Sequence, residues 1–180
     1  MKTKSDYKAD ALAKFQAGPM KSRALRAEHK AEDDFTKILA DIESPIEAMF
    51  LSAFFEEYAL DDAVLWERRA HKYFGSVMMR TELAAQFQIE NYRCDFVIWH
   101  NHPNGTITKI VVECDGHDFH ERTKEQAQRD RSRDRALTAR AWRVLRFTGA
   151  ELYRDSEACV AEVVAIIESD GQYDWMIANG

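Results

Sequence analysis

Three acidic side chains lie at the ends of two apolar segments that have the pattern of neighbouring β-strands. Asp95 belongs to YRCDFVIWH, and Glu113 and Asp115 belong to KIVVECDGHDFH, with the turn sequence HPNGTI between the two segments. Side chains alternate along a strand, so Glu113 and Asp115 point the same way. A tight turn would also bring Asp95 close to Glu113. Packing alone does not explain three carboxylates at such positions.

A divalent cation explains them better, because clustered carboxylates repel one another unless a cation joins them. An oxygen-only ligand set of Asp95, Glu113 and Asp115 suits Mg²⁺, for which Mn²⁺ can substitute. A water on such a cation can become the hydroxide that attacks a phosphodiester. The cluster therefore predicts a metal-dependent nuclease.

Two other interpretations of these residues stay open. Acids at strand ends also occur as solvated side chains that bind nothing. Cys114, His117 and His120 are spaced like a zinc-ligand cluster, which would indicate a zinc-dependent hydrolase. However, strand alternation turns Cys114 away from Asp115 and into the core, and no second Cys or His pair completes a zinc shell.

The elements that position these residues follow from local signals. Ser44-Pro45-Ile46-Glu47 is typical of a helix start, with Ser44 as the cap and Glu47 three residues later, and it predicts a helix over 45–59. We expect an antiparallel strand pair over 93–100 and 107–114, joined at Asn-Gly. A polar helix over 120–140, a strand over 142–147, and a last helix capped by Ser156 and running through Ile167 complete the order: helix, three strands, helix, strand, helix.

At 180 residues the chain is long enough for one domain with its own core. We expect residues 1–43 to form an N-terminal helical extension at the surface, and residues 44–180 to form the main domain. The first residues lack the apolar core of a signal peptide, and no apolar run approaches the ~20 residues that span a bilayer. Three cysteines without a CxxC pair suit a reducing compartment. We therefore expect a cytoplasmic protein without membrane contact.

The charge distribution indicates one basic region. The chain carries 25 Lys and Arg against 31 Asp and Glu, a net charge of −6, yet segment 121–146 is locally basic. A basic stripe on an acidic body fits phosphate binding at one face, although a solvated helix with mixed charges has the same pattern. The candidate nucleic-acid-binding side chains on the expected helix are Lys124, Gln128, Arg131, Arg133 and Arg135, and we expect Asp130 and Asp134 to pair with its arginines.

The region from Ser44 to Leu152 resembles the PD-(D/E)XK nuclease superfamily, and within it the branch that includes very-short-patch repair endonucleases. That branch carries a helical Glu, a strand Asp, an E-x-D-G followed by His, a D-x-x-R helix and a V-x-R-F strand. The matching residues here are Glu47, Asp95, Glu113 to Gly116 with His120, Asp130 to Arg133, and Val144 to Phe147. The resemblance implies an α/β fold with a restriction-endonuclease-like core and a mixed sheet flanked by helices.

By this resemblance, Asp95 and Glu113 would bind the metal, and Glu47 would complete the site through a water, although Glu47 equally fits a simple capping box. Asp115 occupies the place of the superfamily's usual Lys, so another group must supply positive charge. We expect His120 to orient the water or to protonate the leaving oxygen. Ala141 stands where relatives often have Gly before the last strand. The expectation is a Mg²⁺-dependent endonuclease acting on DNA, and the alternative is a catalytically inactive nucleic-acid- or partner-binding domain on the same fold.

Overall fold

The computed structural model describes residues 3–17, 35–58, 80–102, 105–116 and 124–179. Their helices and strands are α1 (Lys4–Ala17), α3 (Pro45–Tyr58), β1 (Arg80–Ile89), β2 (Tyr92–Asn101), β3 (Ile107–Asp115), α4 (Lys124–Thr138), β4 (Arg143–Thr148) and α5 (Gly149–Asn179). Residues 35–41 are also helical. From α3 onward this is the predicted order of helix, three strands, helix, strand and helix.

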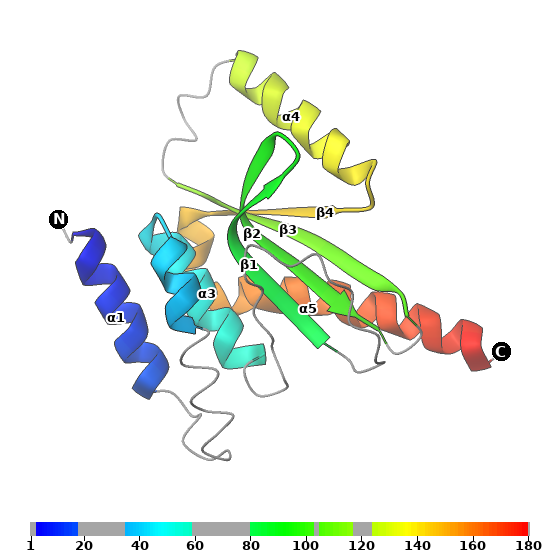
Figure 1. Ribbon diagram of the computed structural model, residues 1–180, viewed down its shortest axis with the longest axis horizontal. Coiled ribbons are helices and arrows are strands. Elements are labelled where there is room, and N and C mark those ends of the chain that lie inside the picture. The colour runs from blue at the N-terminus through cyan, green and yellow to red at the C-terminus, as the bar shows by residue number, and fades with distance from the viewer. Residues whose placement is uncertain (1–2, 18–34, 59–79, 103–104, 117–123, 180) are drawn as a thin grey trace.

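The strands form one mixed sheet in the order β1-β2-β3-β4. β2 and β3 pair antiparallel, as the turn sequence predicts; β1 also pairs antiparallel with β2, whereas β4 runs parallel to β3. α4 makes the crossover between β3 and β4, and Figure 1 shows it on the other side of the sheet from α1 and α3. The result is the predicted α/β fold with a restriction-endonuclease-like arrangement. In the described part of the chain, no helix combines the length and apolar character needed to cross a membrane.

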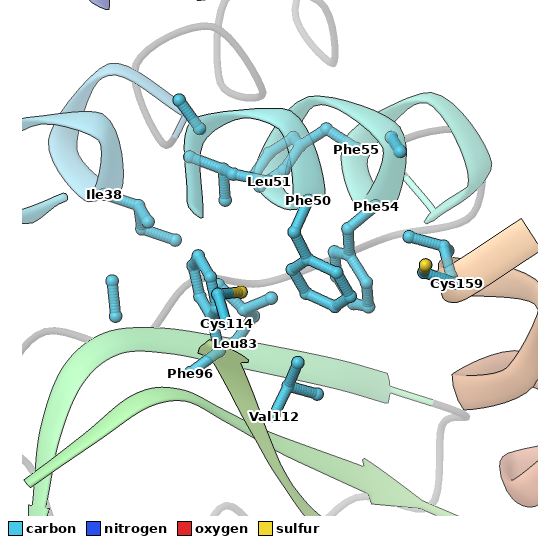
Figure 2. Packing of buried hydrophobic residues seen from close by; sticks show 14 of the residues in the cluster. Ile38, Phe50, Leu51, Phe54, Phe55, Leu83, Phe96, Val112, Cys114 and Cys159 are labelled. Carbon is cyan, nitrogen blue, oxygen red and sulfur yellow. The ribbon is translucent and has the colours of Figure 1, made fainter. Parts of the chain in front are cut away.

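The main core lies between the sheet and the helices α1, α3 and α5. Phe50 of α3 packs on Phe96 of β2 and Phe147 of β4, with ring centroids 5.0 and 6.1 Å apart. Figure 2 shows the phenylalanines of α3 above the strand residues Phe96 and Val112, with the Cys114 side chain among them. Burial of this face is what holds α3, and therefore Glu47 at its first turn, against the sheet.

Residues before Pro45 contribute to the same core. Phe15 of α1 stacks on Phe35 with ring centroids 4.2 Å apart, and both rings meet Phe55 of α3 edge-on. Phe35 and Ile42 are fully buried. The N-terminal segment therefore contributes these apolar side chains to the core, where they complete the covering of α3. The boundary at residue 43 itself stays a prediction.

A smaller apolar cluster lies on the opposite face, under α4. Leu137 of α4 and Trp142 pack there against Val97 and Val111, and Trp99 meets Trp142 edge-on with ring centroids 5.8 Å apart. Only one residue of α4 in this cluster is fully buried, which agrees with the polar sequence of that helix. α4 is therefore mostly exposed to solvent and packs on the sheet through Leu137, near its C-terminal end.

The start of α5 differs from the expected one. Thr148 and Glu151 form a capping box, in which Thr148 N–H donates to Glu151 Oε2 at 2.7 Å. The helix is then interrupted at Asp155, whose φ and ψ are −163° and 85°. Asp155 Oδ1 accepts the Ala158 N–H at 2.9 Å and restarts the helix. Asp155, and not Ser156, is thus the cap of the second segment, which runs past the predicted end at Ile167 to Asn179.

Candidate active site

Asp95 lies where β2 and β3 separate. Their backbone pairing ends at Phe96 opposite Val112. One residue further, Asp95 Oδ2 accepts the backbone N–H of Cys114 at 2.8 Å, so a carboxylate takes the place of a strand carbonyl. This bond fixes the Asp95 side chain against β3, next to Glu113, as the hairpin predicts.

Glu113 is buried and paired with an arginine from α4. Arg133 Nη1 donates to Glu113 Oε2 at 3.2 Å, and Arg133 Nη2 donates to Oε1. The same Nη2 donates to the Arg93 carbonyl at 2.8 Å and lies 3.5 Å from Cys94 Sγ. Only 17% of the Arg133 side chain is exposed. Sequence reasoning placed Arg133 toward nucleic acid, whereas the structure places it inward as the counter-ion of Glu113.

Burial dominates the electrostatics of the two carboxyl groups. Desolvation, with smaller contributions from Glu47 and Asp115, raises the pKa of Asp95 to about 6, although the Cys114 N–H and Arg133 oppose the shift. Desolvation and then Asp95 raise the pKa of Glu113 to about 7, again against the effect of Arg133. The negative charge gathered here is therefore only partly compensated by the chain's own cations.

Asp115 points to the same face as Glu113 and lies near an arginine of β4. Arg146 Nη1 is 3.7 Å from Asp115 Oδ2, and Arg146 Nη2 donates to Asp134 Oδ1 of α4 at 2.7 Å. In the sheet, Arg146 stands directly opposite Glu113. The expectation that Asp134 pairs with arginines of its own helix missed this β4 contact, although the strand position of Arg146 beside Glu113 in a mixed sheet could have indicated it.

Glu47 serves the helix cap and the acidic cluster together. Ser44 Oγ donates to Glu47 Oε1 at 2.5 Å and accepts the Glu47 N–H, which confirms the capping box. Oε2 accepts the Glu43 N–H at 3.0 Å and Gln86 Nε2 at 2.8 Å. The buried Glu47 also acts on Asp95, whose pKa it raises. The capping interpretation of Glu47 is therefore confirmed, whereas its role at a metal ion stays a prediction.

The other predicted residues divide into two groups. Gln128, Arg131 and Arg135 have exposed side chains on α4. Lys124 begins α4, but its side chain lies outside the described residues, as do His117 and His120. The structure thus brings together Glu47, Asp95, Glu113 and Asp115, and leaves the proposed role of His120 a prediction.

The comparison with known families agrees with this architecture. The family model REase_MTES_1575, a restriction-endonuclease-like family, matches residues 77–167, just over half of the chain. The chain belongs to this restriction-endonuclease-like family. The matched segment runs from β1 into α5 and includes Asp95, Glu113 and Asp115. No curated protein and no solved structure matches the chain.

The donor chemistry of this family member's cluster fits a hard cation. Its nearest side chains are carboxylates, and burial leaves their charge in excess, a cost that a divalent cation would relieve. Within the described residues, no group of three or more Asp, Glu, His or Cys side chains is placed so that it could hold a metal ion as it stands. Glu113 reaches Arg133 instead, so cation binding requires this carboxylate to be shared between Arg133 and the ion.

The zinc interpretation does not fit the position of Cys114. Its side chain lies in the apolar core among residues of α3 and the sheet (Figure 2). Desolvation, Asp95 and the other acids raise the thiol pKa well above its ordinary value. Zinc binds the thiolate, and this environment disfavours the thiolate.

Proposed function

We propose that this chain is a Mg²⁺-dependent endonuclease that hydrolyses phosphodiester bonds in DNA, of the branch that includes very-short-patch repair endonucleases. One observation carries the proposal: carboxylates of α3, β2 and β3 come together where β2 and β3 separate, and burial with the neighbouring acids raises the pKa values of two of them, Asp95 and Glu113. Clustered, partly buried carboxylates destabilise the fold, so a role in catalysis explains them better than a role in folding. Membership of a restriction-endonuclease-like family supports such a role.

Asp95, Glu113 and Asp115 would hold the cation, with Mn²⁺ able to replace Mg²⁺. When bound, the cation supplies a water of lowered pKa and neutralises charge on the phosphate. Glu47, fixed by Ser44 and Gln86, would act through a water and not as a direct ligand. Asp95 is held for this task by the Cys114 N–H, which leaves its other oxygen, Oδ1, for the ion. His120 remains the proposed group that orients the water or protonates the leaving oxygen.

DNA would approach along α4. Gln128, Arg131 and Arg135 expose their side chains on that helix, and Lys124 begins it. Contacts from such side chains to phosphates position a duplex without reading its sequence. Arg133 has a different role here, because its guanidinium is already committed to Glu113. It would supply, from the neighbouring helix, the positive charge that the usual Lys provides in the resembling nucleases.

A panel of labelled DNAs tests the proposal: supercoiled, duplex, single-stranded, mismatched and branched, each with Mg²⁺, Mn²⁺ or EDTA. Wild type and Glu113→Ala are purified side by side, because contaminating nuclease is the usual false positive. Gln88→Ala, an exposed change on β1, serves as the matched purification control. Metal-dependent cleavage in wild type and the control, lost in Glu113→Ala, supports the proposal. Equal behaviour of all three proteins on every substrate rejects it.

The Arg133–Glu113 ion pair favours a second candidate, a catalytically inactive nucleic-acid-binding domain. A pair that already neutralises Glu113 needs no cation, and the exposed side chains of α4 alone could bind DNA. Thermal unfolding with Mn²⁺ separates the two candidates. An increase in the unfolding temperature that disappears in Glu113→Ala supports the enzyme. DNA binding that is insensitive to both Mn²⁺ and Glu113→Ala supports the binding domain.

A further inference from the structure

Gln86 holds a backbone conformation that its sequence position does not predict. It lies inside β1, yet its φ is 50°, in the left-handed region that favours glycine. Residues in such conformations persist only when their surroundings enforce them, and they gather at functional sites. Gln86 is also buried, with 5% of its surface exposed.

The left-handed residue reverses the faces of both strands at the acidic cluster. Ala85 and Phe87 are two residues apart and should share a face, but Ala85 packs in the main core and Phe87 packs against the smaller cluster under α4. The same change of face occurs in β2, where Phe96 packs in the main core and Cys94 packs in the smaller cluster under α4. Ala85 pairs with Phe96 and Phe87 with Cys94, so Gln86 stands opposite Asp95 at the point of reversal.

The Gln86 side chain is hydrogen bonded to the carboxylate of Glu47. Its amide nitrogen donates to Glu47 Oε2 at 2.8 Å. An ionised carboxylate only accepts hydrogen bonds, so the nitrogen must face Glu47 and the amide oxygen must face the other way. Glu47 also makes the largest charge contribution to raising the Asp95 pKa. The Gln86 side chain is thus hydrogen bonded to the helix residue Glu47, and its backbone stands opposite the strand residue Asp95.

The amide oxygen, Oε1, is buried and has no hydrogen-bond partner within the described part of the chain. A buried acceptor without a donor is costly, and in native proteins such atoms are commonly satisfied by a water or an ion. Ionised acidic side chains cannot satisfy it, because a carboxylate carries no proton to donate. A water bound to a cation, in contrast, is a strong donor.

We propose that Gln86 is a positioning residue whose Oε1 accepts a hydrogen bond from a water in the shell of the divalent cation held by Asp95 and Glu113. This inference rests on the proposed function. Glu47 holds the amide nitrogen, and the left-handed residue stands opposite Asp95 in the strand pair. Glu47 then influences the water through Gln86 without touching the cation. On this proposal, the strained conformation of Gln86 serves to direct its amide into the site.

Gln86→Met tests the proposal, because Met keeps the length of the side chain and removes both polar atoms. Gln88→Met is the matched control on the same strand: Gln88 is exposed, and its amide donates to the Glu90 carbonyl. Mn²⁺ affinity is read from the electron paramagnetic resonance signal of free Mn²⁺ without DNA, and kcat and KM are measured on the DNA that wild type cuts best. We expect Gln86→Met to weaken Mn²⁺ binding and to lower kcat by about 10- to 100-fold, with KM unchanged. Gln88→Met should stay within about twofold of wild type.

A second variant keeps the question decidable if Gln86→Met does not fold. Glu47→Gln/Gln86→Glu exchanges the amide and the carboxylate, so a hydrogen bond between residues 47 and 86 can be kept while residue 86 gains a charged oxygen. Mn²⁺ should bind this double variant several-fold more tightly than it binds Glu47→Gln. Mn²⁺ affinity and kcat in Gln86→Met that equal those of wild type overturn the inference and leave the nuclease intact; so does Mn²⁺ affinity in the double variant no higher than in Glu47→Gln. Absence of Mn²⁺ binding and of cleavage in wild type itself removes the proposed function, and this inference with it.

Discussion

Arg133 of α4 donates through both terminal guanidinium nitrogens to the two carboxylate oxygens of Glu113 on β3. The pair is largely removed from water, with 17% and 7% of the two side chains exposed. Burial acts to lower the pKa of Arg133, but Glu113 and Cys94 together outweigh it and the guanidinium stays charged. The polar helix α4 is thus connected to the centre of the site by one buried ion pair. In the proposed enzyme, this pair would supply the positive charge that is missing at Asp115, two residues after Glu113.

Removing one partner of this pair should be strongly destabilising. Arg133→Met leaves the Glu113 carboxylate buried without its cation, and we expect a loss of about 3–5 kcal/mol in the free energy of unfolding at pH 8. Urea denaturation measures this loss. Arg135→Met, the same change at an exposed position of α4, should alter stability by less than about 0.5 kcal/mol.

The double variant Glu113→Gln/Arg133→Met gives the internal check. It removes both charges together, so its cost should be clearly smaller than the sum of the two single changes. Additive costs would mean that the two side chains do not stabilise each other in the folded protein. Equal stability of Arg133→Met and Arg135→Met would contradict burial of the pair.

The sequence predicted the parts of the site that local rules determine. The Ser44–Glu47 cap, the turn that pairs β2 with β3, and the common face of Glu113 and Asp115 all follow from spacing over a few residues. The Arg133 and Arg146 contacts and the Gln86 conformation depend on where α4 and β4 pack, which no local pattern contains. Arg133 in particular looks like its solvated neighbours, because a surface arginine and a buried counter-ion have the same sequence signature.

The cap of the second segment of α5 is another feature that the sequence did not predict correctly. Asp155 and Ser156 are both good caps, and the sequence alone favoured Ser156, whereas Asp155 accepts the Ala158 N–H. Asp155→Ala should therefore lower the free energy of unfolding by about 1 kcal/mol, and Ser156→Ala should change it by less than about 0.5 kcal/mol. Thermal or urea unfolding of the two variants decides between the caps. A larger loss in Ser156→Ala would reverse the assignment.

Ala141 ends α4 in a conformation that suits glycine. Its φ is 62°, its N–H donates to the Thr138 carbonyl at 3.0 Å, and the Trp142 N–H donates to the Leu137 carbonyl at 3.1 Å. These bonds form a Schellman motif, supported by packing of Trp142 with Leu137. The alanine side chain is strained there.

Ala141→Gly should therefore stabilise the protein by about 0.5–1 kcal/mol, in spite of glycine's greater freedom in the unfolded chain. An increase in the unfolding temperature would show this gain. Ala139→Gly is the matched control, because Ala139 lies two residues earlier and lacks a positive φ. That variant should be neutral or destabilised, and a similar gain in both variants would contradict the strain at Ala141.

A second polar network, far along the strands from the acidic site, should make stability depend on acid. His100 and Thr81 are hydrogen bonded, with Nδ1 and Oγ1 2.8 Å apart, and the His100 ring meets His102 with centroids 4.7 Å apart. His102 Nε2 in turn contacts Thr108 Oγ1 at 2.8 Å, and Thr108 donates to Asp170 of α5 at 2.7 Å. Burial, and then His102, lower the pKa of His100 to about 4.

Because the ordinary pKa of this imidazole is 6.5, the unfolded chain binds its proton before the folded protein does. The contribution of His100 to stability is therefore complete above pH 6.5 and is lost as the pH falls from 6.5 toward 4. His100→Asn can keep a hydrogen bond to Thr81 and cannot be protonated. Between pH 7.5 and pH 5, wild type should lose about 1 kcal/mol more than this variant, allowing for partial solvent screening. Asp95 and Glu113 titrate with the opposite sign in both proteins, so the difference between the two urea-unfolding profiles isolates His100. Parallel profiles would show that His100 is protonated equally in the folded and unfolded chains.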